Sequence, residues 1–104
     1  SRCSIEEIFG PVVTLHRFSS EEEAVAIANN TRYGLAGSVW TGDLVRGKRI
    51  SESLETGMVW VNTWLHRDLR APFGGVKDSG VGREGGRWSL GFFSEAMNVC
   101  VKHD

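Results

Sequence analysis

The side chains that most often carry out covalent or metal chemistry are few in this sequence and stand apart. The two cysteines, Cys3 and Cys100, lie at opposite ends of the chain, and an activated cysteine needs a neighbouring base or a helix N-terminus. The three histidines, His16, His66 and His103, are isolated and lack the spacing of metal ligands. We therefore expect neither a catalytic nucleophile nor a metal site, and two unpaired cysteines favour a reducing cytoplasm over a disulfide framework.

Glycine gathers in one segment that also carries charged side chains. Seven of the 13 glycines lie between Gly74 and Gly91, together with Lys77, Arg83 and Glu84. Such a density is typical of a backbone that turns sharply or approaches another group closely. A phosphate cradle is one reading, but the run has neither the GxGxxG nor the GxxxxGK[ST] form. We interpret the segment as structural.

Composition limits the possible classes of protein. The chain has 104 residues, of which 40% are hydrophobic and 24% charged, with a net charge of −1. This is at most one domain with a small core, and it is too hydrophobic for a disordered tail. The near-neutral charge predicts no nucleic-acid partner, and no apolar run reaches the roughly 20 residues of a membrane span. We expect no membrane association.

The hydrophobic pattern predicts strands that alternate with helices. Clusters of β-branched and apolar residues indicate strands at 11–18, 35–40 and 58–61, and a last short strand at 98–102 with nothing after it to pair with. Strand–helix–strand alternation with short connections is typical of a parallel sheet covered by helices. The expected fold class is therefore α/β, with a partial parallel sheet and flanking helices.

Two helices are expected between these strands. Ser20 and Glu23 have the spacing of a capping box, and the helix that follows should end at residues 29–30. The second helix should begin at Thr41 or Asp43. Three of its residues are expected to face inward: Leu44, Ile50 and Leu54.

Regularity decreases after the second helix. Gly57 has the position of a residue that terminates it. After Asn62, about 25 residues show no periodic pattern, and a loop of that length indicates function or docking onto other parts. A short helix is expected at 89–96.

Three long motifs follow one another along the chain: EEIFGPV at 6–12, GMVWVN at 57–62 and PFGGVKDSGVGREG at 72–85. Together they resemble the C-terminal part of the NAD(P)-dependent aldehyde dehydrogenases, and the resemblance covers essentially the whole chain. WLHRDLR at 64–70 and NVCVK at 98–102 are similar to a narrower group. These are the muconic semialdehyde dehydrogenases of aromatic-compound degradation, which oxidise 2-hydroxymuconic or 2-aminomuconic semialdehyde.

The resemblance implies that the first motif binds the cofactor, NAD or NADP. In the family, its second glutamate accepts hydrogen bonds from the hydroxyls of the nicotinamide ribose, and that position is Glu7. An ionised carboxylate is a suitable acceptor for a vicinal diol. The phenylalanine that packs beside the nicotinamide corresponds to Phe9. The alternatives are a solvated loop carboxylate for Glu7 and ordinary core packing for Phe9.

The resemblance also places Arg67 and Arg70 in the loop that lines the substrate tunnel. A dicarboxylic semialdehyde carries a carboxylate remote from its aldehyde, and a guanidinium offers a planar fork for it. Arg67 is the better candidate, because tunnel-lining aromatics occupy its place in related enzymes. Trp64 and Phe73 would provide apolar walls. The alternatives are a surface arginine paired with Asp68 or solvent, and core packing for the aromatics.

The resemblance implies three parts of unequal size. Residues 1–78 would belong to the catalytic domain, 79–96 would be a Gly-rich crossing segment with a short helix, and 97–104 would be an oligomerisation strand. The partners implied are a small aldehyde, the remainder of the parent chain and further copies of the protein.

Several parts of the family's machinery are missing from the sequence. The Gly-Gln-x-Cys segment with the nucleophile, the ELGGK-type segment with the general base and the dinucleotide-binding half do not occur. We therefore expect a fragment of an aldehyde dehydrogenase that is inactive alone. The alternative is a free-standing, non-catalytic α/β module for binding or oligomerisation.

Overall fold

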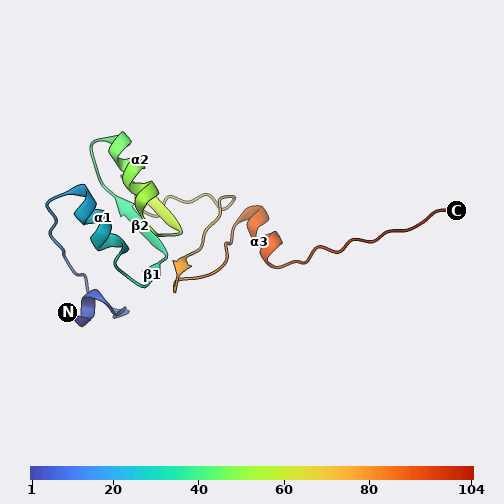
Figure 1. Ribbon diagram of the computed structural model, residues 1–104, viewed down its shortest axis with the longest axis horizontal. Coiled ribbons are helices and arrows are strands. Elements are labelled where there is room, and N and C mark those ends of the chain that lie inside the picture. Colours follow the sequence, from blue (N-terminus) through green and yellow to red (C-terminus); the bar gives the residue numbers. More distant parts are fainter.

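The computed structural model describes residues 1–104 and contains a mixed α/β arrangement (Figure 1). Three α-helices, one short 3-10 helix and four strands follow one another along the chain. In order they are η1 (Arg2–Ser4), α1 (Glu21–Asn29), β1 (Tyr33–Gly34), β2 (Ala36–Val39), α2 (Leu44–Ser53), β3 (Met58–Val61), β4 (Val76–Lys77) and α3 (Gly86–Phe92). None of the helices is both long and apolar enough to cross a membrane.

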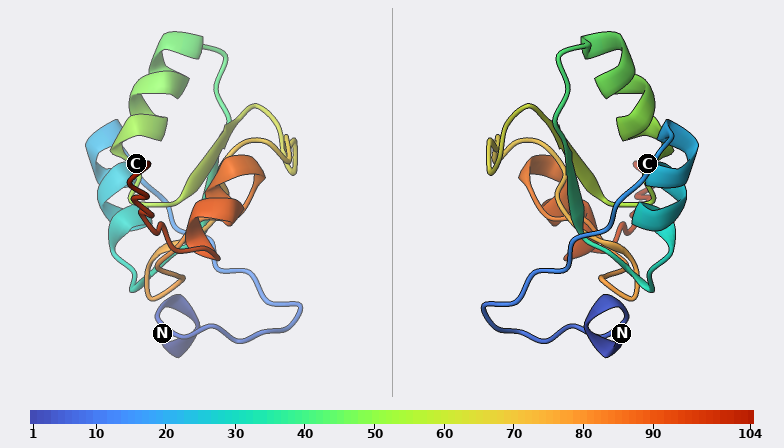
Figure 2. Two further views of the ribbon diagram at one scale, coloured as in Figure 1. Left: turned by 90° about the vertical axis from the view of Figure 1, so that its right-hand side faces the viewer. Right: turned by 90° about the vertical axis from the view of Figure 1, so that its left-hand side faces the viewer.

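The centre of the fold is one β–α–β unit, as the alternating pattern predicts. Strands β2 and β3 pair in parallel, with Ala36 opposite Met58 and Val39 opposite Val61, and α2 connects them. Helices α1 and α2 lie on one side of this pair, and α3 lies on the other (Figure 2). The parallel sheet is narrower than expected, because only two strands join it.

Capping residues define where the two longer helices begin. The Oγ of Ser20 accepts a hydrogen bond from the Glu23 amide at 3.1 Å, which confirms the predicted cap of α1. The Glu23 carboxylate reaches one residue further back, to the backbone N–H and hydroxyl of Ser19. Asp43 caps α2 by accepting from the amides of Val45 and Arg46. Of the two candidates for the second cap, the structure selects Asp43.

The contact between α2 and the sheet is centred on Gly47, which is buried. A Cβ at this position would lie 2.7 Å from Cγ1 of Val61, so only glycine allows the helix to lie this close to β3. Ile50 and Leu54 are half-buried as expected, but Leu44 is 71% exposed, and that prediction was wrong. A sheet of two short strands offers too little area to cover the whole helix face.

Two predicted strands do not form. Residues 11–18 run as an irregular, exposed segment, and 98–102 run as an extended tail beyond α3 (Figure 1). Both have strand-like composition, but a strand requires a neighbour that completes its backbone ladder. No other segment of the chain pairs with either one. The tail contributes to the 74 Å length of the molecule.

The Gly-rich segment is more ordered than its sequence suggests. Strand β4 pairs antiparallel with β1, and Phe73 and Glu84 form an isolated bridge. The Lys77 ammonium donates to the carbonyls of Asn29 and Thr31 at the end of α1. In the same way, Arg83 donates to carbonyls of the glycine-rich turn itself. These cations therefore stabilise the backbone, in agreement with the structural interpretation.

Gly57 does not terminate α2, contrary to expectation. The helix ends at Ser53, and Leu54 is its C-cap in an extended conformation. Gly57 is instead required because the backbone of Gly74 passes directly beside it. The third helix begins at Gly86 and ends at Phe92, earlier than the expected range 89–96. The buried residues are few: Gly34, Val39, Gly47, Trp60 and Gly75.

Candidate functional site

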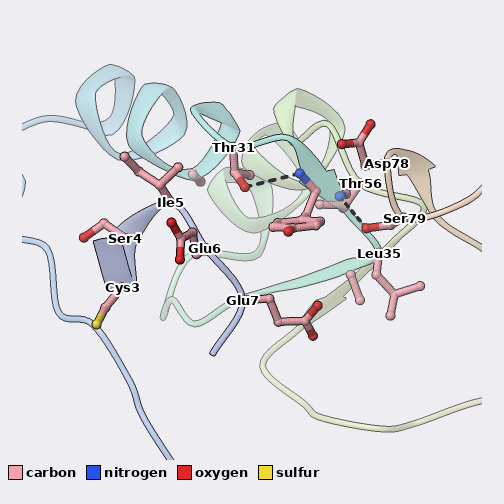
Figure 3. A pocket seen from close by; sticks show the side chains of 14 residues that line it. Cys3, Ser4, Ile5, Glu6, Glu7, Thr31, Leu35, Thr56, Asp78 and Ser79 are labelled. Atoms are coloured by element: carbon pink, nitrogen blue, oxygen red, sulfur yellow. Dashed lines mark hydrogen bonds between the residues drawn. The ribbon is translucent and has the colours of Figure 1, made fainter. Parts of the chain in front are cut away.

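The N-terminal segment and the β1 region enclose a cavity of about 580 Å³. Figure 3 shows Glu6 and Glu7 on one side of it, and Leu35 and Ser79 on the other. On the far wall, the Gly34 amide donates a hydrogen bond to the side-chain Oγ of Ser79 at 2.9 Å. The lining residues include both polar and apolar side chains.

The two adjacent carboxylates of this cavity are not equivalent. Glu6 receives two hydrogen bonds from the Arg2 guanidinium, at 3.1 and 2.8 Å. Glu7 forms neither a hydrogen bond nor an ion pair within the chain, and it lines the cavity. Its two oxygens are free to accept hydrogen bonds from a ligand, which is the chemistry that a ribose diol requires.

Phe9 lies two residues beyond Glu7 in an unusual backbone conformation. Its φ is +52°, in the left-handed region that a phenylalanine rarely adopts. The side chain is 93% exposed, so core packing within this chain does not account for it. A free carboxylate and an uncovered aromatic ring fit the nicotinamide riboside of NAD(P), and the two line a second cavity of about 310 Å³.

The second group of candidate residues lies on the loop that follows β3. Trp60, the most buried aromatic residue at 5% exposure, donates from Nε1 to the His66 carbonyl at 2.8 Å. The Trp64 ring packs against it, with the ring centroids 4.8 Å apart. The loop is thus anchored to the sheet by the Trp60–Trp64 contact, and Trp64 remains 59% exposed.

Arg67 is held between an aromatic ring and a carboxylate. Its guanidinium carbon lies 4.0 Å from the centroid of the Phe73 ring, a cation–π geometry. One guanidinium nitrogen contacts the Glu84 carboxylate at 3.3 Å. The side chain is 33% exposed. Because the contact with Glu84 uses one nitrogen, the other N–H groups are available to an anion.

Arg70 has the contacts of a surface residue. It is 89% exposed and forms short hydrogen bonds to both oxygens of Asp68. This pairing holds the pKa of the Asp68 carboxyl below its usual range. The alternative that the sequence left open, an arginine paired with Asp68, therefore describes Arg70 and not Arg67.

The candidate residues fall into two groups by their contacts. Arg67 lies over Phe73, and Trp64 packs on Trp60 at the start of the same loop, whereas Glu7 and Phe9 both line the cavity of about 310 Å³ near the N-terminus. Cys3 and Cys100 are both exposed and free. No group of three or more potential metal ligands is present.

Two residues that the sequence analysis did not single out as site residues form hydrogen bonds that hold this region together. Glu84, within the Gly-rich motif, contacts Arg67. Asn62, the first residue after β3, bonds the Val39 carbonyl at the end of β2 through its backbone and Thr41 through its side chain. An asparagine directly after a buried strand was the available signal for the second, but only coordinates reveal its partners.

Comparison with known proteins identifies relatives of one kind. The model of the aldehyde dehydrogenase family matches residues 1–99. The chain is 57% identical over its whole length to 2-aminomuconic 6-semialdehyde dehydrogenase from Pseudomonas sp, covering 21% of that protein. It is 54% identical over 97 residues to 2-hydroxymuconic semialdehyde dehydrogenase from Pseudomonas putida, covering 93% of this chain and 20% of the relative.

Solved structures agree with these sequence relatives. The Mycobacterium tuberculosis aldehyde dehydrogenase complexed with NAD⁺ superimposes with a TM-score of 0.83 at 48% identity, over 88% of this chain and 19% of that one. The chain therefore spans about a fifth of the length of the proteins it matches.

Proposed function

The chain belongs to the aldehyde dehydrogenase family, and we propose that it is part of an NAD(P)-dependent enzyme that oxidises a muconic semialdehyde to the carboxylic acid. Within that enzyme it provides one side of the nicotinamide ribose site and part of the substrate tunnel. The names of the two muconic semialdehyde dehydrogenases support this substrate class. The names of these relatives include both the 2-aminomuconic and the 2-hydroxymuconic semialdehyde.

The observation that carries the substrate class is the environment of Arg67. An unpaired carboxylate is costly to bring into an apolar tunnel, and a guanidinium offsets that cost by pairing with it. Phe73 covers one face of the Arg67 guanidinium, while Glu84 takes a single contact. The remaining N–H groups are those we assign to the remote carboxylate of the substrate. Trp64 and Phe73 supply the apolar surface beside it.

We assign the cofactor contact to Glu7 and Phe9. When bound, the nicotinamide accepts a hydride from the aldehyde carbon. The Glu7 carboxylate, which has no partner in the chain, accepts hydrogen bonds from the ribose hydroxyls. The Phe9 ring, whose backbone conformation turns it away from the chain, covers the nicotinamide from one side.

The remaining assignments concern the parts of the chain. Residues 1–78 form part of the catalytic domain, 79–96 cross from it, and 97–104 form a strand that pairs in a homo-oligomer. The apolar residues Met97, Val99 and Val101 recur at every second position of that extended tail, which suits one face of a strand. The protein acts in the cytoplasm, where its two exposed cysteines stay reduced.

The test of the substrate class is Arg67→Ala in the full-length enzyme containing this chain. A partly exposed pair falls at the lower end of the 2–5 kcal/mol range, so we expect loss of about 2 kcal/mol, or roughly 30-fold in kcat/KM, for a muconic semialdehyde. A neutral aliphatic aldehyde makes no use of the guanidinium, and its kcat/KM should change little. Arg70→Ala is the matched control and should leave both substrates unaffected.

The outcomes separate the possible roles of the two arginines. Equal losses for both aldehydes in Arg67→Ala make Arg67 a scaffold residue, and the dicarboxylate assignment then fails. A selective loss in Arg70→Ala instead keeps the substrate class and moves the carboxylate site to Arg70.

A further inference from the structure

Asn62 occupies the point at which the parallel sheet ends and the loop at 63–71 begins. Its backbone N–H donates to the Val39 carbonyl at 2.8 Å, which adds one hydrogen bond beyond the paired strands. Its side chain then bonds Thr41 twice. Oδ1 accepts from the Thr41 amide, and Nδ2 donates to the Thr41 carbonyl, both at 2.8 Å.

These two bonds reproduce what a further strand residue would provide. In a parallel ladder, the N–H and C=O of one residue are bonded by groups of the two flanking residues on the neighbouring strand. Here the carboxamide of Asn62 provides both groups to Thr41, so the backbone of Thr41, two residues beyond β2, is satisfied without a further residue of β3. The main chain after Asn62 can therefore leave the sheet, while the backbone groups of Thr41 on the neighbouring segment stay hydrogen-bonded.

The backbone of Asn62 turns sharply at the same point. Its φ is +55°, a left-handed conformation that asparagine tolerates better than most residues. Other residue types satisfy only part of this combination. Glycine allows the turn without the bonds, aspartate lacks the donor, and alanine lacks both bonds and is strained.

The released chain is the loop that carries the residues assigned to the substrate. Its next anchor is the His66 carbonyl, bound by Nε1 of Trp60. Trp64 lies between these two anchors, and Arg67 follows the second. The direction in which the loop leaves Asn62 therefore helps to set where Trp64 and Arg67 lie, together with the contacts of Trp64 with Trp60 and of Arg67 with Phe73. Ligands of open α/β sheets bind at this carboxyl edge of the strands.

We propose that Asn62 is a positioning residue for the substrate loop, acting by replacing a strand residue with its carboxamide. This rests on the proposed function for its substrate arm, but the order of the loop can be measured without any substrate. Its side chain has no direct part in binding, since both of its polar atoms are engaged with Thr41.

The experiment combines two measurements on the full-length enzyme containing this chain. Hydrogen–deuterium exchange, followed by mass spectrometry without substrate, reports the order of residues 63–71. In Asn62→Ala, we expect the amides of this loop and of Thr41 to exchange about 30-fold faster, as for the loss of two hydrogen bonds worth about 1 kcal/mol net each. Helix α2 should keep its exchange rate. The KM for a muconic semialdehyde should rise about tenfold while the KM for a neutral aldehyde changes less.

Three further variants complete the design. Asn62→Gly keeps the turn but loses the bonds, so it should resemble Asn62→Ala, and it carries the test if the alanine variant does not fold. Asn62→Asp keeps the acceptor alone and should be intermediate. Asn30→Ala is the matched control, because Asn30 is exposed and the hydrogen bonds it makes at the end of α1 come from its backbone N–H. It should match the wild type in both measurements.

The results that would overturn the proposal are specific. Wild-type exchange at 63–71 in Asn62→Gly would mean that the carboxamide does not hold the loop. A KM that rises equally for both aldehydes, with α2 also deprotected, would make Asn62 a general stability residue. If Arg67→Ala proves unselective while the loop exchange in Asn62→Ala is still accelerated, the substrate class fails and the positioning role stands.

Discussion

Replacing Gly57 by alanine tests how the Gly-rich motif is joined to the parallel sheet. A Cβ on Gly57 would lie 1.6 Å from the carbonyl oxygen of Gly74 and 2.7 Å from its carbonyl carbon. These are main-chain atoms, so no side-chain rotation can relieve the overlap. Gly57 has no positive φ, and the requirement for glycine is therefore one of space alone.

The size of the effect follows from the movement that is needed. The Gly74 peptide must retreat by roughly 1.4 Å to reach even a tight 3.0 Å contact. That peptide directly follows Phe73, whose backbone is bonded to Glu84. The next residue, Gly75, is buried, and its carbonyl accepts from Arg83. Overpacking commonly costs 1–3 kcal/mol, and a clash between two rigid backbones should reach or exceed about 4 kcal/mol.

The assay is the thermal midpoint by differential scanning fluorimetry, with Gly91→Ala as the control. An added Cβ at Gly91 meets nothing within 4 Å, and Gly91 lies inside α3. Alanine there should raise stability by about 0.5–1 kcal/mol, because glycine is the poorer helix former. Gly57→Ala should thus lower the thermal midpoint strongly or prevent folding, whereas Gly91→Ala should raise the midpoint slightly.

The functional readout is the position of Phe73 beneath Arg67. If the variant folds, the KM for a muconic semialdehyde should rise as that ring moves. A Gly57→Ala protein with a midpoint and KM near wild type would refute the close approach of the two backbones.

The remaining predictions concern the cofactor, acid stability and the isolated chain. Glu7→Ala in the full-length enzyme should weaken NAD(P) binding and slow the oxidation of every aldehyde alike. Glu6→Ala should do neither, since Glu6 is paired with Arg2. If a binding titration with NAD(P) and the oxidation rates show equal losses in the two variants, the assignment of Glu7 is wrong. Bonds from the Arg46 and Val45 amides lower the pKa of Asp43, and the Arg49 guanidinium lowers that of Glu21. Because folding depresses both pKa values, their stabilising contribution is present above about pH 4–5 and is lost as the pH falls further. Asp43→Asn should therefore flatten the acid side of a plot of the thermal midpoint against pH. An unchanged slope would count against a stabilising role of the Asp43 cap. The 104-residue chain alone should not oxidise aldehydes; NADH formation that disappears in Cys3→Ser or Cys100→Ser would show otherwise. Its unpaired tail should cause self-association, and a strictly monomeric species in concentrated sedimentation runs would contradict this.

Local signals in the sequence predicted the elements whose stabilising contacts are also local. The cap at Ser20 and the end of α1 at residues 29–30 were both predicted in place. Each depends on residues within a few positions, and capping bonds of this kind form wherever the helix does. The position of strand β3 at 58–61 was also predicted from its composition, although its hydrogen bonds go to β2, more than 20 residues away. The family motifs likewise need no coordinates, because they are contiguous strings of residues.

Strand composition alone did not predict which strands form. Residues 11–18 and 98–102 have the apolar and β-branched residues of strands, yet neither finds a partner. The pairing of β1 with β4, across more than 40 residues, had no signal in either segment. A strand depends on hydrogen bonds to a distant part of the chain, so its existence is decided by the tertiary arrangement.

The candidate sites divide along the same line. The sequence alone identified Glu7, Phe9, Arg67, Arg70, Trp64 and Phe73 as the residues with suitable chemistry. Only the structure showed that Arg2 forms hydrogen bonds with Glu6 and leaves Glu7 without a partner. In the same way, Asp68 pairs with Arg70, while the guanidinium of Arg67 lies over the Phe73 ring. A charged side chain is available to a ligand only to the extent that its neighbours leave some of its polar groups unpaired, as the single contact with Glu84 does for Arg67. That condition depends on distances between residues, which the order of residues along the chain does not specify.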